Sequence, residues 1–211
     1  MTAGAAVTGE ILFGALSYFR NFEELHVRGD RFEGKHLYHS PAGLEITKTS
    51  TGEKLLLPWA FESSVREQDI FVFCLSLTKS EELAREFKAD VCVEILRPER
   101  LLAGIRGALK RRPRIKNKQL IHGPITYYSP IDPPNAIWAV PEQVTMRKTT
   151  DFQRQQEFRI AFSVNDTFRV NNVGTQLSAT PGAQSPSLDG HPQEILKIGT
   201  IRGFCSIHSF S

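Results

Sequence analysis

Two pairs of polar residues have the types and the spacing that suit a ligand-binding cleft. Ser76 and Thr78 are two residues apart at the end of an apolar run, residues 69–78, and Gln155 and Glu157 are two residues apart in a second, alternating stretch. Residues two apart in an extended strand point to the same face, so each pair places two polar groups side by side. Hydroxyls, an amide and a carboxylate supply both donors and acceptors to a ligand. One interpretation is therefore that Gln155 and Glu157 line a cleft.

The second stretch, residues 150–162, is predicted to be a strand with one apolar and one polar face. The apolar face carries three large side chains and should face a core, whereas the polar face carries a carboxylate and a guanidinium, with Gln155 two residues earlier. These residues are Phe158, Ile160 and Phe162 on the apolar face, and Glu157 and Arg159 on the polar face. A solvated strand face explains the same polarity without any cleft. Hydroxyls that bond neighbouring backbone would likewise explain Ser76 and Thr78.

The remaining pattern predicts one α+β domain over residues 1–211, with mixed or antiparallel sheets and a few short helices. The run at 69–78 is apolar on both faces for most of its length, which is typical of a central strand. Ser80 followed by two glutamates predicts the start of a short helix, and Pro98 predicts the first turn of another that ends near Lys110. Residues 171–193 are rich in small and polar residues and are predicted to be a flexible loop or insertion. Further strands are expected at residues 11–20, 90–96, 120–128, 194–199 and 203–207.

Composition bounds the class of protein. The chain has 211 residues, of which 40% are hydrophobic and 23% charged, as in an ordinary soluble domain. Three widely spaced cysteines, Cys74, Cys92 and Cys205, lie in apolar runs and are expected to be reduced, which favours a cytoplasmic location. No apolar run approaches the roughly 18 residues of a membrane span, and residues 1–10 lack the basic start of a signal peptide.

A basic run follows the second predicted helix. Seven Lys or Arg residues lie between Arg106 and Lys118, and no Asp or Glu occurs between Glu99 and Asp132. Such a run at a helix end complements the negative end of the helix dipole and needs no partner. The alternative is a patch that binds nucleic acid or a protein partner without catalysis. The patch would consist of Lys110, Arg111, Arg112, Arg114 and Lys116.

The order of the polar motifs resembles the Arg-Ser-Glu class of ADP-ribosyltransferases. In that class a Ser-x-Ser/Thr strand supports the cleft for NAD, and a later Gln/Glu-x-Glu strand carries the catalytic glutamate. Here Ser76-x-Thr78 and Gln155-x-Glu157 occur in the same order. The first motif of the class is an arginine on the first strand, and Arg20 has the matching order. The resemblance implies a split sheet, NAD as substrate, and a setting in phage–host conflict or as a toxin.

The resemblance also implies roles for these residues. Glu157 would stabilise the positive charge that develops on the ribose as the nicotinamide bond breaks. Arg20 would bind the pyrophosphate through its planar donor fork, with Ser76 and Thr78 as the other cofactor-binding residues. Ser76 would hold the nicotinamide amide or order its strand, and Gln155 would orient the acceptor. The candidate catalytic residues are thus Glu157, Gln155 and Ser76. The alternative for Arg20 is that it is a surface cation with no role in binding.

The chain also resembles a diffuse group of uncharacterised bacterial and phage proteins over roughly residues 10–165. Their shared pattern is an N-terminal strand, an acidic loop, a Phe-x-x-Ser-x-Ser/Thr strand, a helix and a late strand that carries Glu-x-Arg after an upstream Lys. The matching residues are Asp30, Glu33, Ser76, Lys148, Glu157 and Arg159. That group implies no particular activity.

A third interpretation uses the acidic residues as metal ligands. Asp30, Glu33 and Glu157, with Lys148 or Arg159 nearby, would hold Mg²⁺ for phosphodiester hydrolysis. Nothing in their spacing demands a metal, and Asp30 and Glu33 are expected to cap and pair within their own loop rather than to bind a metal. The sequence therefore predicts no metal site.

Overall fold

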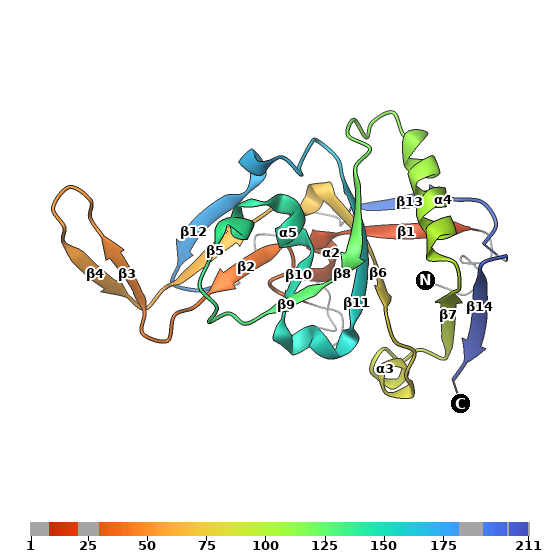
Figure 1. Cartoon of the computed structure of the whole chain (residues 1–211), viewed down its shortest axis with the longest axis horizontal. Helices are drawn as coiled ribbons and strands as arrows, with labels where there is room; N and C mark the ends of the chain where they lie inside the picture. The colour runs from red at the N-terminus through yellow and green to blue at the C-terminus, as the bar shows by residue number, and fades with distance from the viewer. Residues whose placement is uncertain (1–8, 21–29, 182–191, 202, 211) are drawn as a thin grey trace.

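A five-stranded antiparallel sheet forms the centre of the α+β fold (Figure 1). The computed structural model describes residues 9–20, 30–181, 192–201 and 203–210. The strand order is β13-β1-β6-β11-β8, so the two stretches with polar pairs, β6 and β11, are neighbours at the middle of the sheet. The bounds are β1 Glu10–Ala15, β6 Ile70–Ser76, β8 Leu120–Pro124, β11 Glu157–Ser163 and β13 Gln193–Lys197.

The largest core cluster lies between this sheet and helix α4 (Pro98–Lys110). The buried face of α4 includes Leu101, Ile105 and Leu109, at the three- and four-residue spacing of an amphipathic helix. Phe13 of β1 packs edge-on against Phe162 of β11, with ring centroids 5.1 Å apart. Phe13 and Phe162 thus belong to the same core cluster as the buried face of α4.

Three smaller strand groups surround the central sheet. The sheet β12-β5-β2 is antiparallel, the β9–β10 pair is parallel, and the β3–β4 hairpin extends away from the body (Figure 1). The bounds are β2 Lys35–Tyr38, β3 Leu44–Thr47, β4 Lys54–Leu57, β5 Ala60–Ser64, β9 Thr126–Tyr128, β10 Arg147–Thr149 and β12 Gly174–Ser178. Short helices connect them: α2 Leu16–Arg20, α5 Pro141–Thr145 and the 3₁₀ turns η1 Glu67–Asp69, η2 Ala136–Ala139, η3 Thr150–Gln155 and η4 Val170–Asn172.

A separate two-stranded ribbon stands beside the central sheet. It consists of β7 (Val91–Ile95) and β14 (Cys205–Ser209), and it is connected to the end of β6 through α3 (Glu81–Glu86). Ser80 caps α3, because its hydroxyl accepts from the backbone N–H of Leu83 at 3.1 Å. The predicted helix starts at Ser80 and Pro98 are thus confirmed.

The structure corrects four predictions about local structure. The first strand ends at Ala15 and residues 16–20 form α2, so Arg20 is not on a strand. Residues 150–155 form the 3₁₀ turn η3, and only Glu157 onward is strand. Ile125 separates β8 from β9, which were predicted as one strand. The segment predicted as a loop, residues 171–193, contains strand β12, although its residues 182–191 lie outside the described part.

Within the described ranges, no helix has both the length and the apolar character to cross a membrane.

Candidate active site

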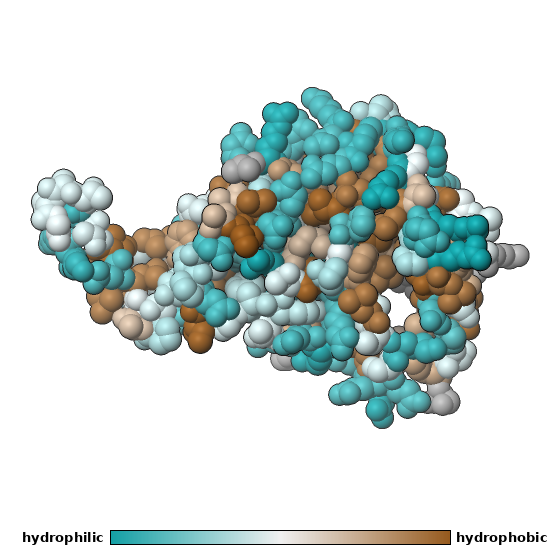
Figure 2. Space-filling model, viewed as in Figure 1, coloured by the Kyte–Doolittle hydropathy of each residue, from teal (hydrophilic) through white to brown (hydrophobic). Residues whose placement is uncertain are grey.

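A pocket of about 460 Å³ opens where the central sheet divides. β1 pairs with β6 only through Gly14–Val72 and Ala15–Phe71, so the two strands separate beyond that point. The space is bounded by β1, β6, α2, α3 and β7, and most of its lining is apolar. In Figure 2 an opening is visible where Figure 1 shows the space between β6 and β7, with apolar residues on both sides.

The pocket brings together the four polar residues predicted from the two stretches. Ser76, Thr78, Gln155 and Glu157 all line it. The fifth predicted residue, Arg20, is the last residue of α2, and its side chain lies outside the described residues. The structure therefore supports the predicted meeting of the Ser-x-Thr and Gln-x-Glu motifs and leaves the role of Arg20 as a prediction.

The polar end of the pocket is held by contacts between the ends of β6 and β11. Glu157 is the direct partner of Ser76 in the antiparallel register. The Ser76 hydroxyl donates to the backbone oxygen of Gln155 at 2.9 Å. Gln156 between them has φ 42°, a left-handed conformation that is uncommon for a residue with a side chain. That turn ends η3 and lets both Gln155 and Glu157 line the pocket, although they do not share one strand face as predicted.

Glu157 belongs to a buried network of two carboxylates and two cations. Its Oε1 accepts from Arg159 Nε at 2.7 Å, and its Oε2 lies 2.8 Å from Lys148 Nζ. Arg159 Nη1 lies 2.6 Å from Glu33 Oε1, and Lys148 Nζ lies 3.6 Å from Glu33 Oε2. The formal charges cancel, which is how fully buried ions are tolerated. The polar face of β11, which was predicted to be either solvated or a cleft wall, is thus buried. Glu157 lines the pocket, and 4% of its surface is exposed.

The network keeps Glu157 ionised. Burial alone would raise the pKa of this carboxyl group, but the charges and hydrogen bonds of Arg159 and Lys148 outweigh burial and lower the pKa to about 2. For Lys148, burial is likewise outweighed, and the two glutamates raise its pKa. The pocket therefore contains a carboxylate that is negative at every physiological pH. Such a group suits stabilisation of positive charge better than donation of a proton.

Sequence reasoning missed the residues that complete this site. The hydroxyl oxygen of Tyr127, in β9, accepts a hydrogen bond from the backbone N–H of Glu157 at 2.9 Å. This contact fixes the start of β11. Leu83 and Phe87, at α3, form part of the apolar wall. Helical spacing places Leu83 and Phe87 on one face, four residues apart, but the sequence does not show that this face covers a pocket rather than a closed core.

Asp30 lies beside the network and carries a testable pH dependence. Burial, followed by repulsion from Glu33, raises its pKa from 3.8 to about 6. Because the folded pKa is above the unfolded value, the native state binds the proton more tightly, and stability is lost as pH rises from 3.8 through 6. Asp30→Asn is expected to raise the free energy of unfolding at pH 8 by at most about 3 kcal/mol and to leave it unchanged at pH 3.5.

Urea unfolding at the two pH values measures this effect. Asn preserves the acceptor that Asp30 Oδ1 offers to the backbone N–H of Phe32 at 2.8 Å. Asp132→Asn is the matched control, since Asp132 accepts a backbone N–H from Ser129 in the same way but is exposed. An equal effect of Asp30→Asn at both pH values would contradict the pKa argument.

The basic run has a structural use that was not predicted. Arg111 donates to the backbone oxygen of Lys197 at 3.0 Å, Arg112 donates to that of Ile195, and Arg114 forms an ion pair with Glu194. All three acceptors lie on β13, the outer strand of the central sheet. An open strand edge invites pairing with other chains, and these side chains cover it. Lys110, Arg111, Arg114 and Lys116 are all exposed, and binding of a partner by this patch stays a prediction.

The geometry gives no support to the metal-dependent interpretation. Glu33 and Glu157 both direct oxygens to Arg159. Among the residues that the structure describes, no group of three or more His, Cys, Asp or Glu is arranged to hold a metal ion.

Comparison with known proteins found no family model, no curated protein and no solved structure that matches the chain.

Proposed function

We propose that the pocket binds NAD or a related nucleotide and that Glu157 assists cleavage of its bond between base and ribose, in the manner of an ADP-ribosyltransferase. The observation that supports this most is that Ser76, Thr78, Gln155 and Glu157 line one pocket. They come from stretches about 80 residues apart in sequence, in the order of the class that the chain resembles. The pocket also lies where two strands of the central sheet separate, as a split sheet requires.

The charge at the polar end suits this reaction. As the bond between C1′ of the ribose and the base breaks, the bonding electrons leave with the base and positive charge develops on the sugar ring. A carboxylate beside the ribose stabilises that charge. Each oxygen of Glu157 already has one cationic partner, and each retains a second lone pair that can accept a ribose hydroxyl. Lys148 and Arg159 orient the carboxylate, and the apolar wall excludes water from the base.

The proposal is tested by incubating the protein with NAD labelled in its adenine ring and measuring release of nicotinamide and transfer of label. Glu157→Gln is expected to lower the rate by about 10²–10³-fold, the usual cost of removing one group that stabilises transition-state charge. Thr78→Val, at an exposed position of the pocket, is expected to weaken NAD binding by a few fold.

A matched control separates chemistry from folding. Glu62→Gln removes another buried carboxylate that pairs with a lysine, Lys35, but Glu62 is on β5 and does not line the pocket. Thermal unfolding of each variant reports its stability. If the wild-type protein neither binds nor cleaves NAD, or if Glu157→Gln and Glu62→Gln reduce the rate equally, the proposal is wrong.

A further inference from the structure

In the part of the chain that the structure describes, the second half of β6 has a backbone edge without a partner strand, and this edge faces the pocket. In an antiparallel pair, every second residue directs both its N–H and its C=O to the same neighbouring strand. Leu77 N–H donates to the oxygen of Gln156 at 2.8 Å, and these residues are opposite one another, one step beyond the Ser76–Glu157 pair. Odd-numbered residues here therefore face β11. It follows that Cys74 and Ser76 direct their backbone groups to the other side.

On that other side the neighbouring strand is β1, and its pairing with β6 does not extend to Cys74 or Ser76. Among the described residues, β1 reaches β6 only at Gly14–Val72 and Ala15–Phe71. Both Cys74 and Ser76 line the pocket. Within the described part of the chain, the backbone donors and acceptors of this part of β6 thus have no partner strand on the pocket side.

β7 offers a second unpaired edge to the same pocket. Leu96 N–H donates to the oxygen of Phe204 at 2.9 Å, and Phe210 N–H donates to that of Asp90 at 3.0 Å. Even-numbered residues of this segment therefore face β14. By the same alternation, Val91 and Val93 direct their backbone groups away from β14, and the described strands include no partner for that edge.

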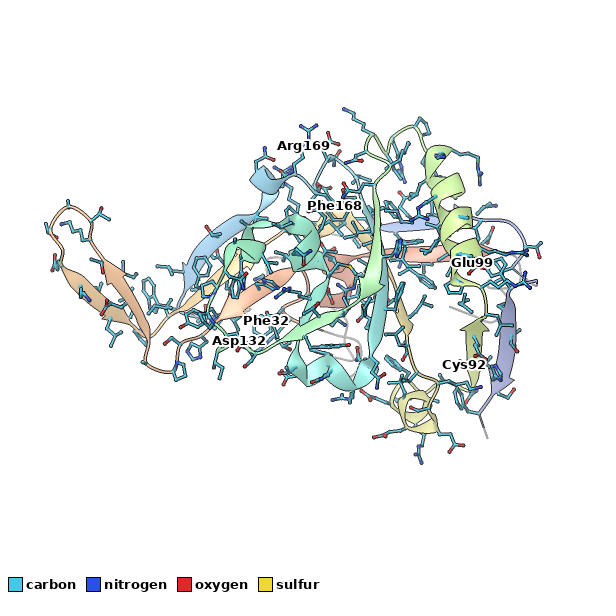
Figure 3. The ribbon with its side chains drawn as sticks, viewed as in Figure 1. Phe32, Cys92, Glu99, Asp132, Phe168 and Arg169 are labelled. Atoms are coloured by element: carbon cyan, nitrogen blue, oxygen red, sulfur yellow. The ribbon has the colours of Figure 1, made fainter. Side chains whose placement is uncertain are left out.

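The two edges flank one opening. Val91 and Cys92 of β7 line the pocket together with Cys74 and Ser76 of β6. Figure 1 shows β6 and β7 running in opposite directions on the two sides of the space that Figure 2 shows as an opening. Figure 3 labels Cys92 on the ribbon, across this space from β6. The free edges of β6 and β7 therefore border the same opening from two sides.

We propose that this opening accepts an extended, apolar-rich segment of a second polypeptide, which adds as a strand between β6 and β7. Only a main chain in extended conformation supplies donors and acceptors to both sides at strand spacing. Apolar side chains at the opening are exposed, with Leu12 42% and Val91 39% accessible, and would pack against the side chains of the added strand. Open edges of this kind are normally covered in proteins. The inference uses the same pocket as the NAD proposal but does not depend on it.

The test begins with selection from a library of random linear dodecapeptides against the wild-type protein without NAD, followed by titration of a selected synthetic peptide. Because both sides of an added strand are paired, N-methylation at either of two adjacent central positions is expected to weaken binding by about tenfold. A peptide that binds through its side chains alone would tolerate the methyl groups.

The protein side is tested at Val91. Val91→Pro removes the N–H that faces the opening and leaves the β14 ladder intact, since Val91 does not donate to β14, and proline is tolerated at the first residue of an edge strand. Val91→Ala is the matched control, because it removes the side chain and keeps the N–H. We expect about a tenfold loss of affinity for proline and less than about threefold for alanine.

Three outcomes would overturn the inference: no selected peptide, binding that tolerates N-methylation at both positions, or equal effects of proline and alanine. If Val91→Pro does not fold, the N-methylated peptides on the wild-type protein still decide the question. Absence of NAD turnover together with N-methyl-sensitive peptide binding would reject the proposed function and support this inference.

Discussion

Arg159→Met is expected to lower the free energy of unfolding by about 3–5 kcal/mol, the range observed when one partner of a buried ion pair is removed. Arg159 is fully buried and contacts Glu33 at 2.6 Å, Glu157 at 2.7 Å and the backbone oxygen of Thr145 at 2.5 Å. Methionine keeps much of the apolar volume but provides no donor. Two buried carboxylates would then share Lys148 as their remaining cation within the network.

Urea unfolding at pH 7 measures this loss, and Arg154→Met is the matched control. Arg154 is nearby in sequence and pairs with Glu86 at 2.7 Å, but it is exposed, so its loss should cost at most about 1 kcal/mol. Adding Glu33→Gln to Arg159→Met is expected to recover part of the stability, because one unpaired charge is removed. A cost below 1 kcal/mol for Arg159→Met would show that water reaches the network.

The alternation of apolar and polar residues predicted which strands meet but not what covers them. The pattern at Phe158, Ile160 and Phe162 correctly placed that face in the core beneath α4. The opposite face was interpreted as solvated or as a cleft wall. The metal interpretation did bring Glu33, Lys148 and Arg159 close to Glu157, but as a site for Mg²⁺ and not as a buried network in which the cations pair with the carboxylates. A single sequence shows the period of a strand but not the partner of its polar face, because that partner depends on tertiary packing.

The same limit explains the errors at the segment boundaries and the unpredicted contacts of the basic run. Residues 150–155 alternate well enough to predict a strand, but the left-handed turn at Gln156 depends on contacts with β6, including Leu77 N–H to the oxygen of Gln156. The small and polar residues 174–178 form β12 because β5 offers a free edge to them. Arg111 and Arg112 were predicted either to complement the end of the helix dipole or to belong to a patch for a partner. Their backbone acceptors on β13 were not predicted, because the position of β13 beside α4 is not encoded in any local pattern.

His36→Phe is expected to remove most of a large acid-dependent loss of stability. His36 is completely buried, lies 4.7 Å from both Tyr128 and Trp138 by ring centroids, and neither ring nitrogen has a hydrogen-bond partner among the described residues. Burial, followed by the charge of Arg147, lowers its pKa from 6.5 to about 3. The unfolded state therefore binds the proton more tightly than the native state between these values, and stability falls as pH decreases from 6.5 to 3.

The full shift corresponds to at most about 5 kcal/mol of stability lost by pH 3, since one pKa unit is about 1.4 kcal/mol. Phenylalanine fills a similar volume between the two rings and has no titratable group, so the free energy of unfolding of His36→Phe should change much less with pH over this range. Urea unfolding at pH 3.5, 5 and 7 measures the difference between the variant and the wild-type protein. Comparing the two at each pH cancels the contributions of Asp30 and Glu157, whose folded pKa values are also shifted.

The matched control is His39→Phe, three residues away at an exposed position. His36 is unchanged in this variant, so the control should retain the acid-dependent loss of the wild-type protein. If His36→Phe retains that loss as well, protonated His36 must be accommodated in the folded state, which would require β2 or η2 to open. Because Trp138 is in η2 and packs against His36, its fluorescence would report that opening directly.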